Sequence, residues 1–207
     1  MTDTVAKLDL PGFSYGGTPV LGPVALRVAK GETLALTGPS GIGKSTLLRI
    51  LAGLTKAPGT RRVTGRVAFV FQEPTLLRWR SAQRNIEIAA KVSPAKAAAT
   101  LYDVGLAAYA DRFPDQLSLG QQRRLALARA FACDPDLMLL DEPFVSLDAA
   151  AASEMMTLFA ALASRHDMAS VIVTHAPEEA RRLATRTLTL SGTPAQITAD
   201  VLTHAPA

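Results

Sequence analysis

Short apolar runs alternate with amphipathic segments along most of the chain. Residues 137–140 and 170–173 are continuously apolar or small, as expected for strands covered on both faces. We predict strands at Val24–Val28, Thr33–Leu36, Val67–Phe71, Leu137–Leu140, Val171–Thr174 and Thr187–Leu190. We predict helices at Lys44–Ala52, Ala82–Ala90, Pro94–Val104, Gln121–Cys133, Ala149–Ser164 and Pro177–Ala184. This alternation favours an α/β fold with a mostly parallel sheet.

Two stretches depart from the alternation. The interval from Glu73 to Ala132 reads as almost wholly helical, which predicts a helical subdomain inserted at about residues 73–132. The first forty residues favour antiparallel strands, with turns at Gly16-Gly17 and Lys30-Gly31. We therefore expect one domain over residues 1–207, with an N-terminal antiparallel β-subdomain. The tail from about 191 to 207 carries no clear structural signal.

The composition is that of a globular chain. It has 207 residues, of which 48% are hydrophobic and 19% are charged, enough apolar surface to form a sizeable core. No apolar run reaches the ~18–20 residues of a membrane-spanning helix. The first ten residues lack the apolar segment of a secretory signal, and a lone Cys133 excludes an internal disulfide framework. We expect a soluble, cytosolic chain.

The net charge is +4, but the basic residues do not form a patch typical of nucleic-acid binding. They occur as scattered pairs, with no long Lys/Arg run and no interleaved aromatic residues. Most of these pairs are interpreted as solvated faces. We therefore expect no nucleic-acid partner.

A glycine-rich turn lies between the strand predicted at Thr33–Leu36 and the helix predicted at Lys44–Ala52. It fits the pattern G-x-x-x-x-G-K-[ST] over Gly38, Pro39, Ser40, Gly41, Ile42, Gly43, Lys44, Ser45 and Thr46. A strand, such a turn and a helix in this order form a phosphate-binding loop, whose amides point at phosphate oxygens. We expect Lys44 to reach the terminal phosphates and Ser45 to be a magnesium ligand, with Thr46 adding a second hydroxyl.

A second motif is a buried strand that ends in two carboxylates. Leu137–Leu140 is followed by Asp141 and Glu142, which places both at the carboxyl edge of the sheet, where ligands bind in open α/β folds. We expect Asp141 to hold Mg²⁺ and Glu142 to polarise the attacking water as a general base. Together the two motifs indicate a nucleoside triphosphatase.

The segment Leu117, Ser118, Leu119, Gly120 and Gln121 opens a predicted helix ahead of the acidic strand. With the two motifs above, it resembles the ATP-binding cassette (ABC) family, the nucleotide-binding subunits of ABC transporters. The family pattern is Leu-Ser-Gly-Gly-Gln, and here Leu119 occupies the third position. The resemblance implies the ABC ATPase fold, ATP and Mg²⁺ as ligands, and a γ-phosphate contact by Ser118, Gly120 and Gln121.

Further residues resemble family elements in the family's order, from about residue 8 to residue 190. Tyr15 resembles the aromatic residue that stacks on adenine, with Phe13 a poorer candidate. Gln72 resembles the glutamine that senses Mg²⁺, the attacking water and the membrane partner. Asp148 lies in the segment that crosses to the opposite subunit, and His175 resembles the histidine that contacts the γ-phosphate. Two departures are an alanine after His175, where the family often has Asp, and a short interval between Lys44 and Gln72, which suggests a trimmed hairpin.

The resemblance also implies partners. Because the chain has one copy of each motif, we expect a head-to-tail homodimer or a pair with a related ATPase subunit. The segment from Glu73 to Arg80 resembles that of bacterial importers, in which it faces integral membrane permease subunits. Trp79 in this segment is either an interface anchor or a core residue. These expectations place the chain at the cytoplasmic face of the bacterial inner membrane, in a system that includes a periplasmic solute-binding protein.

Three other functions stay open at this stage. The first is a cassette that drives export or the release of lipids or lipoproteins. The second is a nucleic-acid-associated ABC ATPase, against which the single short cassette speaks. The third is a small-molecule kinase with a phosphate loop, against which the Ser118–Gln121 segment and His175 speak. The sequence does not name a transported solute.

Overall fold

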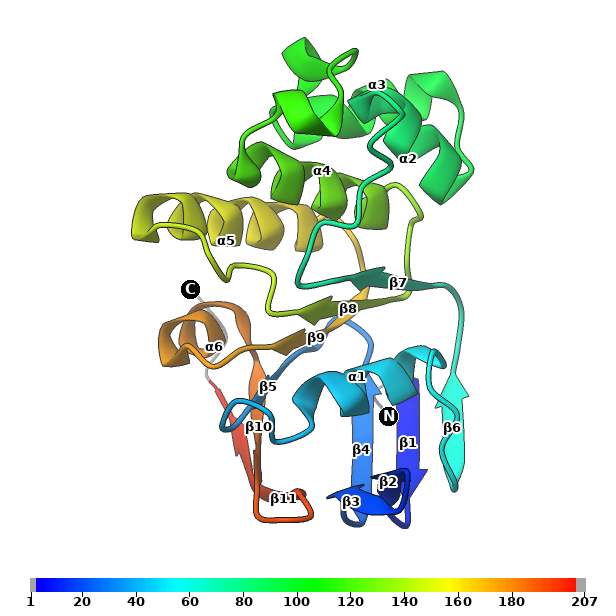
Figure 1. Ribbon diagram of the computed structural model, residues 1–207, viewed down its shortest axis with the longest axis vertical. Coiled ribbons are helices and arrows are strands. Elements are labelled where there is room, and N and C mark those ends of the chain that lie inside the picture. Colours follow the sequence, from blue (N-terminus) through cyan, green and yellow to red (C-terminus); the bar gives the residue numbers. More distant parts are fainter. Residues whose placement is uncertain (1–2, 204–207) are drawn as a thin grey trace. The chain divides into compact units, whose positions relative to one another are not determined.

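The computed structural model describes residues 3–203, which fall into two compact units. The sheet unit contains residues 3–69, 136–142 and 167–203, and the helical unit contains residues 70–135 and 143–166. Figure 1 labels their helices and strands. No helix within residues 3–203 is both long enough and apolar enough to span a bilayer.

The sheet unit is built around a six-stranded sheet with the order β11-β10-β5-β9-β8-β7. Strands β10, β5, β9 and β8 are parallel to one another, and β11 pairs antiparallel with β10. The bounds are β5 (Thr33–Thr37), β7 (Val67–Val70), β8 (Leu137–Asp141), β9 (Ala169–Val173), β10 (Arg186–Ser191) and β11 (Gln196–Leu202). Every residue of β8 and β9 is buried, as their continuous apolar pattern predicts.

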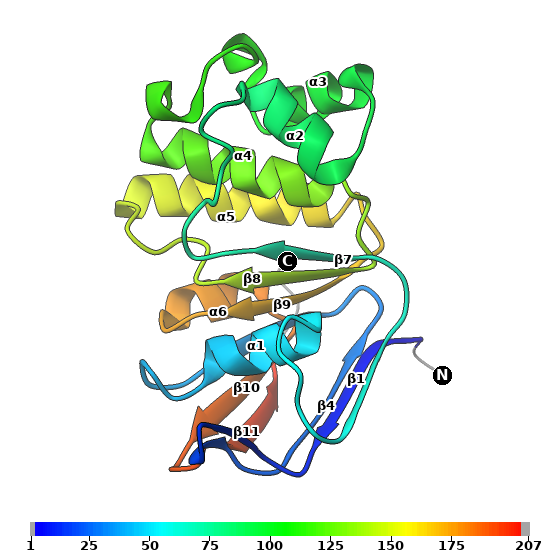
Figure 2. The ribbon, with the colours of Figure 1, turned by 45° about the vertical axis from the view of Figure 1, so that its right-hand side comes forward.

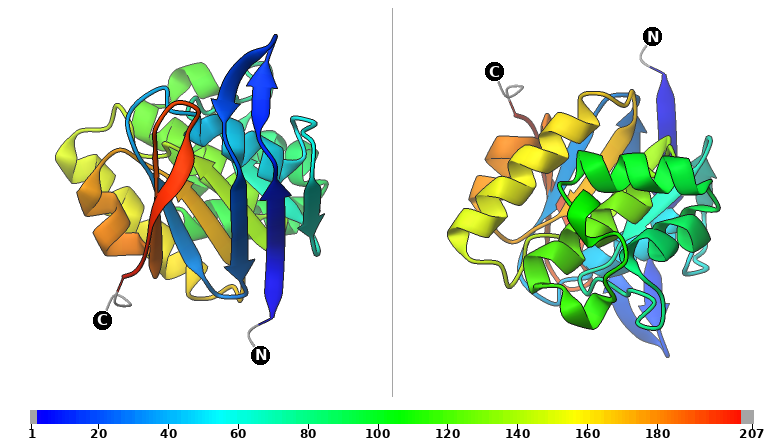
Figure 3. Two further views of the ribbon diagram at one scale, coloured as in Figure 1. Left: turned by 90° about the horizontal axis from the view of Figure 1, so that it is seen from below. Right: turned by 90° about the horizontal axis from the view of Figure 1, so that it is seen from above.

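A second, antiparallel sheet has the order β4-β1-β6. Its strands are β1 (Thr4–Leu10), β4 (Val24–Ala29) and β6 (Thr60–Val63), and the left view of Figure 3 shows β1 beside β4. Strands β2 (Phe13–Tyr15) and β3 (Thr18–Leu21) form a hairpin around Gly16-Gly17. The short interval between Lys44 and Gln72, where we expected a trimmed hairpin, contributes one strand, β6, which pairs with β1.

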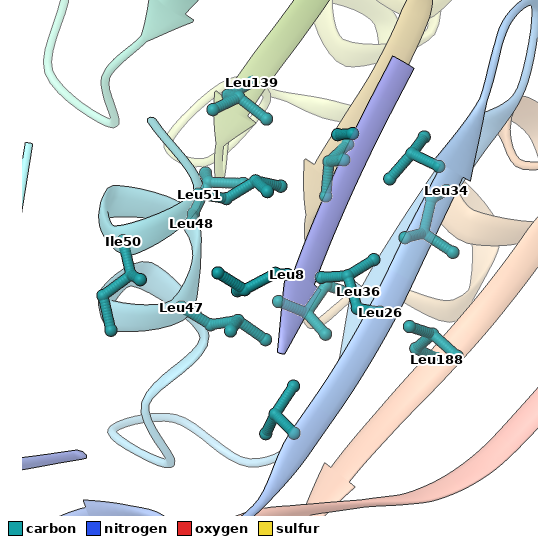
Figure 4. Close-up of a cluster of buried hydrophobic side chains, with 14 of the residues drawn as sticks. Leu8, Leu26, Leu34, Leu36, Leu47, Leu48, Ile50, Leu51, Leu139 and Leu188 are labelled. Atoms are coloured by element: carbon teal, nitrogen blue, oxygen red, sulfur yellow. The ribbon is translucent and has the colours of Figure 1, made fainter. Parts of the chain in front are cut away.

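Helix α1 (Lys44–Ala52) forms one hydrophobic core with both sheets. Its Leu47, Leu48 and Leu51 recur at helical spacing and are almost completely buried. Figure 4 shows them meeting Leu8 of β1 and Leu36 of β5. Gly53 ends the helix in a left-handed conformation, with φ of 79° and its N–H donating to the carbonyl oxygens of the last turn. The unit's other helix is α6 (Pro177–Leu183).

The helical unit contains α2 (Ala82–Ala90), α3 (Pro94–Asp103), α4 (Leu119–Phe131) and α5 (Ala149–Ala163), with 3-10 turns at Ala107–Tyr109 and Pro114–Gln116. Figure 2 shows α4 alongside α5. Each of the four helices begins at a side chain that accepts a backbone N–H, as helix N-caps do. These caps are Ser81, Ser93, Ser118 and Asp148.

The structure corrects the sequence interpretation in three places. Helix α4 begins at Leu119 rather than Gln121, because Ser118 is its cap. Residues 73–80 are irregular rather than helical, and residues 196–202 of the tail form strand β11. The mostly parallel core sheet and the antiparallel N-terminal sheet are as predicted. That residues 1–207 form one domain with an insertion at 73–132 stays a prediction; helix α5 groups with the helical unit.

Candidate active site

The glycine-rich turn at residues 38–43 joins β5 to α1 with a backbone that only glycine suits. Gly38 has φ of 137°, and a Cβ there would lie 2.5 Å from the carbonyl oxygen of Leu190. Gly43 has φ of 110°, and a Cβ there would lie 2.9 Å from Cδ2 of Leu21. The turn can therefore close tightly against β10 and β3 and begin α1 directly at Lys44.

Lys44 lies inside this turn. It is only 4% exposed, and its Nζ donates to the carbonyl oxygens of Gly38 at 2.9 Å and Pro39 at 2.8 Å. Burial lowers the pKa of Lys44, while the carboxylates of Glu142 and Asp141 oppose that change. The ammonium group is thus held within the phosphate loop. A terminal phosphate bound there would replace the carbonyl oxygens of Gly38 and Pro39 as its partner.

Ser45 and Asp141 are 96 positions apart in the sequence and meet at the start of α1. The Ser45 hydroxyl donates to Oδ1 of Asp141 at 2.7 Å. Asp141 is buried at the end of β8, and burial raises its pKa, with the Ser45 hydrogen bond and the charges of Arg49 and Lys44 acting in the opposite direction. A hydroxyl and a carboxylate oxygen side by side fit Mg²⁺, which takes one or two protein oxygens together with phosphates and waters.

Glu142 and His175 face each other beside this pair. Oε1 of Glu142 lies 3.5 Å from Nδ1 of His175, and His175 is the more exposed of the two. Glu142 has φ of 46°, an uncommon conformation for a residue with a Cβ, and its N–H donates to the carbonyl of Val173 at 3.1 Å. Backbone strain of this kind clusters at functional sites. The carboxylate is therefore held at the rim of the sheet rather than within it.

Glu179 of α6 is a site neighbour that the sequence interpretation missed. Its Oε2 accepts the Thr174 hydroxyl at 2.5 Å, and the same hydroxyl accepts the N–H of Ala176 at 2.9 Å. These bonds close the loop that carries His175. Burial raises the pKa of Glu179, and the Thr174 hydrogen bond and the His175 charge lower it. A glutamate in the first turn after His175 was the signal available in the sequence.

Tyr15 belongs to the sheet unit but lies on the exposed β2–β3 hairpin. It is 48% exposed and makes an edge-to-face contact with Phe13, with ring centroids 4.7 Å apart and planes at 88°. One ring of the pair can thus support the other while leaving an aromatic face open. This arrangement suits stacking on a flat base.

The remaining predicted site residues lie in the helical unit. Ser118 and Gln121 cap α4 reciprocally: the Ser118 hydroxyl accepts the Gln121 N–H at 3.3 Å, and Oε1 of Gln121 accepts the Ser118 N–H at 2.9 Å. Leu119 is 43% exposed, so its side chain is not part of a core. Asp148 caps α5 by accepting the Ala151 N–H at 2.8 Å. Gln72 is exposed, and Gly120 has space for a Cβ.

The structure thus brings together Lys44, Ser45, Asp141, Glu142 and His175 within the sheet unit. It places Gln72, Ser118, Gly120, Gln121 and Asp148 on the separate helical unit. A phosphate loop after a parallel strand, with a buried acidic strand beside it, defines the class of P-loop nucleoside triphosphatases.

Comparisons with known proteins define the family. The ABC transporter family matches residues 21–145. The aliphatic sulfonates import ATP-binding protein SsuB of Granulibacter bethesdensis is 44% identical over 194 residues, which cover 92% of this chain and 82% of that protein. The protein of the same name from Mycobacterium avium is 42% identical over 197 residues, covering 91% and 78%.

Solved structures agree. A dimeric ATP-binding cassette in a post-hydrolysis state with ADP and Pi has a TM-score of 0.84 and 27% identity, covering 97% of this chain and 99% of that chain. An inward-facing ABC transporter described as of the metal-chelate type has a TM-score of 0.86 and 27% identity, covering 97% and 84%. The chain belongs to the ABC transporter family. It is an ATP-binding and ATP-hydrolysing subunit, and the predicted ABC ATPase fold is confirmed.

Proposed function

We propose that this chain powers solute uptake through separate permease chains. ATP binding closes a pair of ATPase subunits beneath the permease, and ATP hydrolysis reopens the pair. The observation that supports the proposal most directly is the Ser45–Asp141 pair, 2.7 Å apart, next to the buried Lys44 and the strained Glu142. In one small region these groups supply a cation that can bind phosphate, a magnesium site and a carboxylate. Each is a part that phosphoryl transfer to water needs.

In the proposed reaction, amides of residues 38–43 and Lys44 hold the β- and γ-phosphates. Ser45, Asp141 and Gln72 would hold Mg²⁺, which would supply positive charge to neutralise the phosphates. Glu142 accepts a hydrogen bond from the attacking water and takes its proton as the water oxygen bonds to the γ-phosphorus. The bond from the γ-phosphorus to the bridging oxygen of ADP breaks in the same step, which releases ADP and phosphate. His175, the neighbour of Glu142, donates to the γ-phosphate, and Tyr15 stacks on adenine.

We propose a head-to-tail dimer as the working form. The chain has one phosphate loop and one Ser118–Gln121 segment. Ser118, Gly120 and Gln121 of one copy would meet the γ-phosphate held by the other, and Asp148 would lie along the same junction. The N–H groups at the start of α4 point at an anion placed there. A relative in the comparisons is described as dimeric with ADP and Pi.

We further propose import rather than export, with the chain at the cytoplasmic face of the membrane. The relatives are named aliphatic sulfonates import ATP-binding proteins. An organosulfonate delivered by a solute-binding protein is accordingly the first substrate to test. Trp79 is 67% exposed, so its expected alternative role in a core is wrong, and the exposed ring remains available to a permease.

The test is reconstitution with permease chains, which an importer should have encoded beside its ATPase subunit. In vesicles that carry the permease, ATP on the side of this chain should drive uptake of an alkanesulfonate presented with its binding protein on the other side. Uptake should require both the permease and Mg²⁺. ATP-driven release of solute from loaded vesicles would instead favour an exporter, and binding to DNA or RNA at physiological salt would revive the nucleic-acid alternative.

A further inference from the structure

Two arginines of α4 hold the backbone of the segment that begins at Gln72. Nη1 of Arg123 donates to the carbonyl of Gln72 at 3.0 Å and to the carbonyl of Pro143 at 3.1 Å. Two turns further along the helix, Nη1 of Arg129 donates to the carbonyl of Thr75 at 2.9 Å. Helix α4 is therefore fastened to both ends of residues 72–75.

Arg123 is buried and Arg129 is half-buried, and neither has a carboxylate partner within residues 3–203. Arg123 is only 7% exposed, and Nε of both side chains is buried with no hydrogen-bond partner among the described residues. Burial lowers the pKa of Arg123 and of Arg129. The neighbouring Arg124 differs, because it pairs with Glu154 at the surface at 2.7 Å. A buried cation that only backbone carbonyls satisfy is costly, and an apolar side chain would fill the space at less cost.

The segment held by the arginines is itself strained and tightly fixed. Thr75 has φ of 44°, an outlier for a β-branched residue, and such conformations persist only where the surroundings impose them. Downstream, the fully buried Asn85 accepts from the N–H of Leu77 at 2.8 Å and donates to the carbonyl of Arg80 at 2.9 Å. Trp79 lies between these anchors and stays exposed. Figures 1 and 2 show the chain between β7 and α2 running past α4.

We propose that Arg123 and Arg129 are positioning residues that transmit displacement of α4 to the exposed turn around Trp79. This inference rests on the proposed function, in which the first turn of α4 meets ATP. When Ser118 and Gln121 contact a phosphate, α4 moves as a rigid body. Because Arg123 and Arg129 are hydrogen-bonded to the carbonyls of Gln72 and Thr75, these two residues move with the helix. Because Thr75 is strained, a small shift at its carbonyl can change the turn's conformation. Trp79 then presents a different surface to the protein partner.

The chain's single tryptophan reports on the turn directly. In a Glu142→Gln background that binds but does not consume ATP, addition of Mg-ATP should change the fluorescence of Trp79. Arg123→Met should abolish most of this change while leaving nucleotide affinity as in the parent. The matched control is Arg124→Met, which removes an adjacent surface arginine and should keep the full change.

Arg129→Met is the second variant, because Arg129 is only half-buried and its loss is easier for the fold to tolerate. If Arg123→Met does not fold, a diminished response in Arg129→Met supports the inference and an undiminished one overturns it. A parent protein whose Trp79 does not respond to Mg-ATP, or an Arg123→Met response equal to that of Arg124→Met, overturns the inference too. Failure of the wild type to bind or hydrolyse ATP would overturn the proposed function instead.

Discussion

Nδ1 of His175 lies 3.5 Å from Oε1 of Glu142, at the ends of two adjacent parallel strands. The register of β8 and β9 places Asp141 opposite Val173, so the next residues of both strands emerge at the same edge of the sheet. Two groups separated by more than thirty positions in the sequence thereby share one small volume. A water beside this pair could hydrogen-bond to both side chains at once.

Glu142→Gln should bind Mg-ATP and hydrolyse it poorly. The amide keeps the size of the side chain but cannot take the proton of the attacking water, so the rate should fall by roughly 10²- to 10⁴-fold. ATP that is bound and not consumed should accumulate a dimer, which light scattering coupled to gel filtration measures. Glu154→Gln, a change on the surface of α5, is the control and should keep wild-type turnover. Normal hydrolysis by Glu142→Gln would show that another group is the base.

Lys44→Ala should lose nucleotide affinity rather than turnover alone. The ammonium group is held between the carbonyls of Gly38 and Pro39, so it is in place before the phosphates arrive. Loss of a charged hydrogen bond of about 1.5–3 kcal/mol corresponds to roughly 10- to 150-fold weaker binding. Equilibrium binding of a fluorescent ATP analogue measures this. Lys30→Ala, which removes the surface partner of Asp167, should leave affinity unchanged.

Tyr15→Ala should weaken ATP binding modestly and leave the maximal hydrolysis rate intact. A single base–aromatic stacking contact contributes about 1–3 kcal/mol, and Tyr15 is the ring with the larger exposed face. Binding of ATP should suffer more than binding of inorganic triphosphate, because only ATP has the base. Tyr102→Ala, at a highly exposed position on α3, is the matched control. Equal affinities for Tyr15→Ala and wild type would assign the role to Phe13 or to no aromatic residue.

Much of the fold follows from local patterns in the sequence. The buried strands β8 and β9 could be predicted because their runs are apolar without interruption, and α1 and α2 because their apolar positions recur at helical spacing. The phosphate loop could be predicted because its glycines, lysine and serine occur at fixed offsets. Strand β11 could not, since its residues alternate only weakly and it forms by pairing with β10.

The missed residues depend on tertiary contacts. Arg123 looks like one more basic residue on a helix, and only the folded chain shows that it is buried against the carbonyls of Gln72 and Pro143. Asn85 lies in a helix with no local sign that its amide binds the turn before that helix. Polar side chains that satisfy distant backbone groups leave no periodic pattern, which is why sequence periodicity cannot find them.

Asp141→Asn should stabilise the protein at neutral pH in the absence of nucleotide. Burial raises the pKa of Asp141 above its unfolded value, so the folded chain binds this proton more tightly than the unfolded chain. The free energy of unfolding therefore decreases as pH rises through the interval between the two pKa values, and it stays lower above that interval. The Asn variant has no such loss and still offers an oxygen to Ser45.

Urea midpoints measured across pH test this prediction. The Asp141→Asn variant should exceed wild type at pH 7, and the difference should vanish below the ordinary carboxyl pKa of 3.8. The exposed Asp115→Asn change is the control and should show no difference at either pH. A less stable Asp141→Asn protein at pH 7 would mean that attraction to Lys44 and Arg49 outweighs the cost of burying the carboxylate.

Thr174→Val should slow hydrolysis while leaving the apparent KM for ATP nearly unchanged. The Thr174 hydroxyl links Glu179 to the N–H of Ala176 and so fixes the loop that carries His175, and valine removes the hydroxyl without changing the side chain's shape. Because such a hydrogen bond contributes about 1 kcal/mol, kcat should fall by roughly three- to tenfold. Thr174→Ser keeps the hydroxyl and should restore most of the rate. Glu179→Gln keeps an acceptor and should resemble the serine variant, whereas Glu179→Ala should resemble valine. If all four variants hydrolyse ATP at the wild-type rate and only their melting temperatures differ, the hydrogen bonds stabilise α6 without positioning His175.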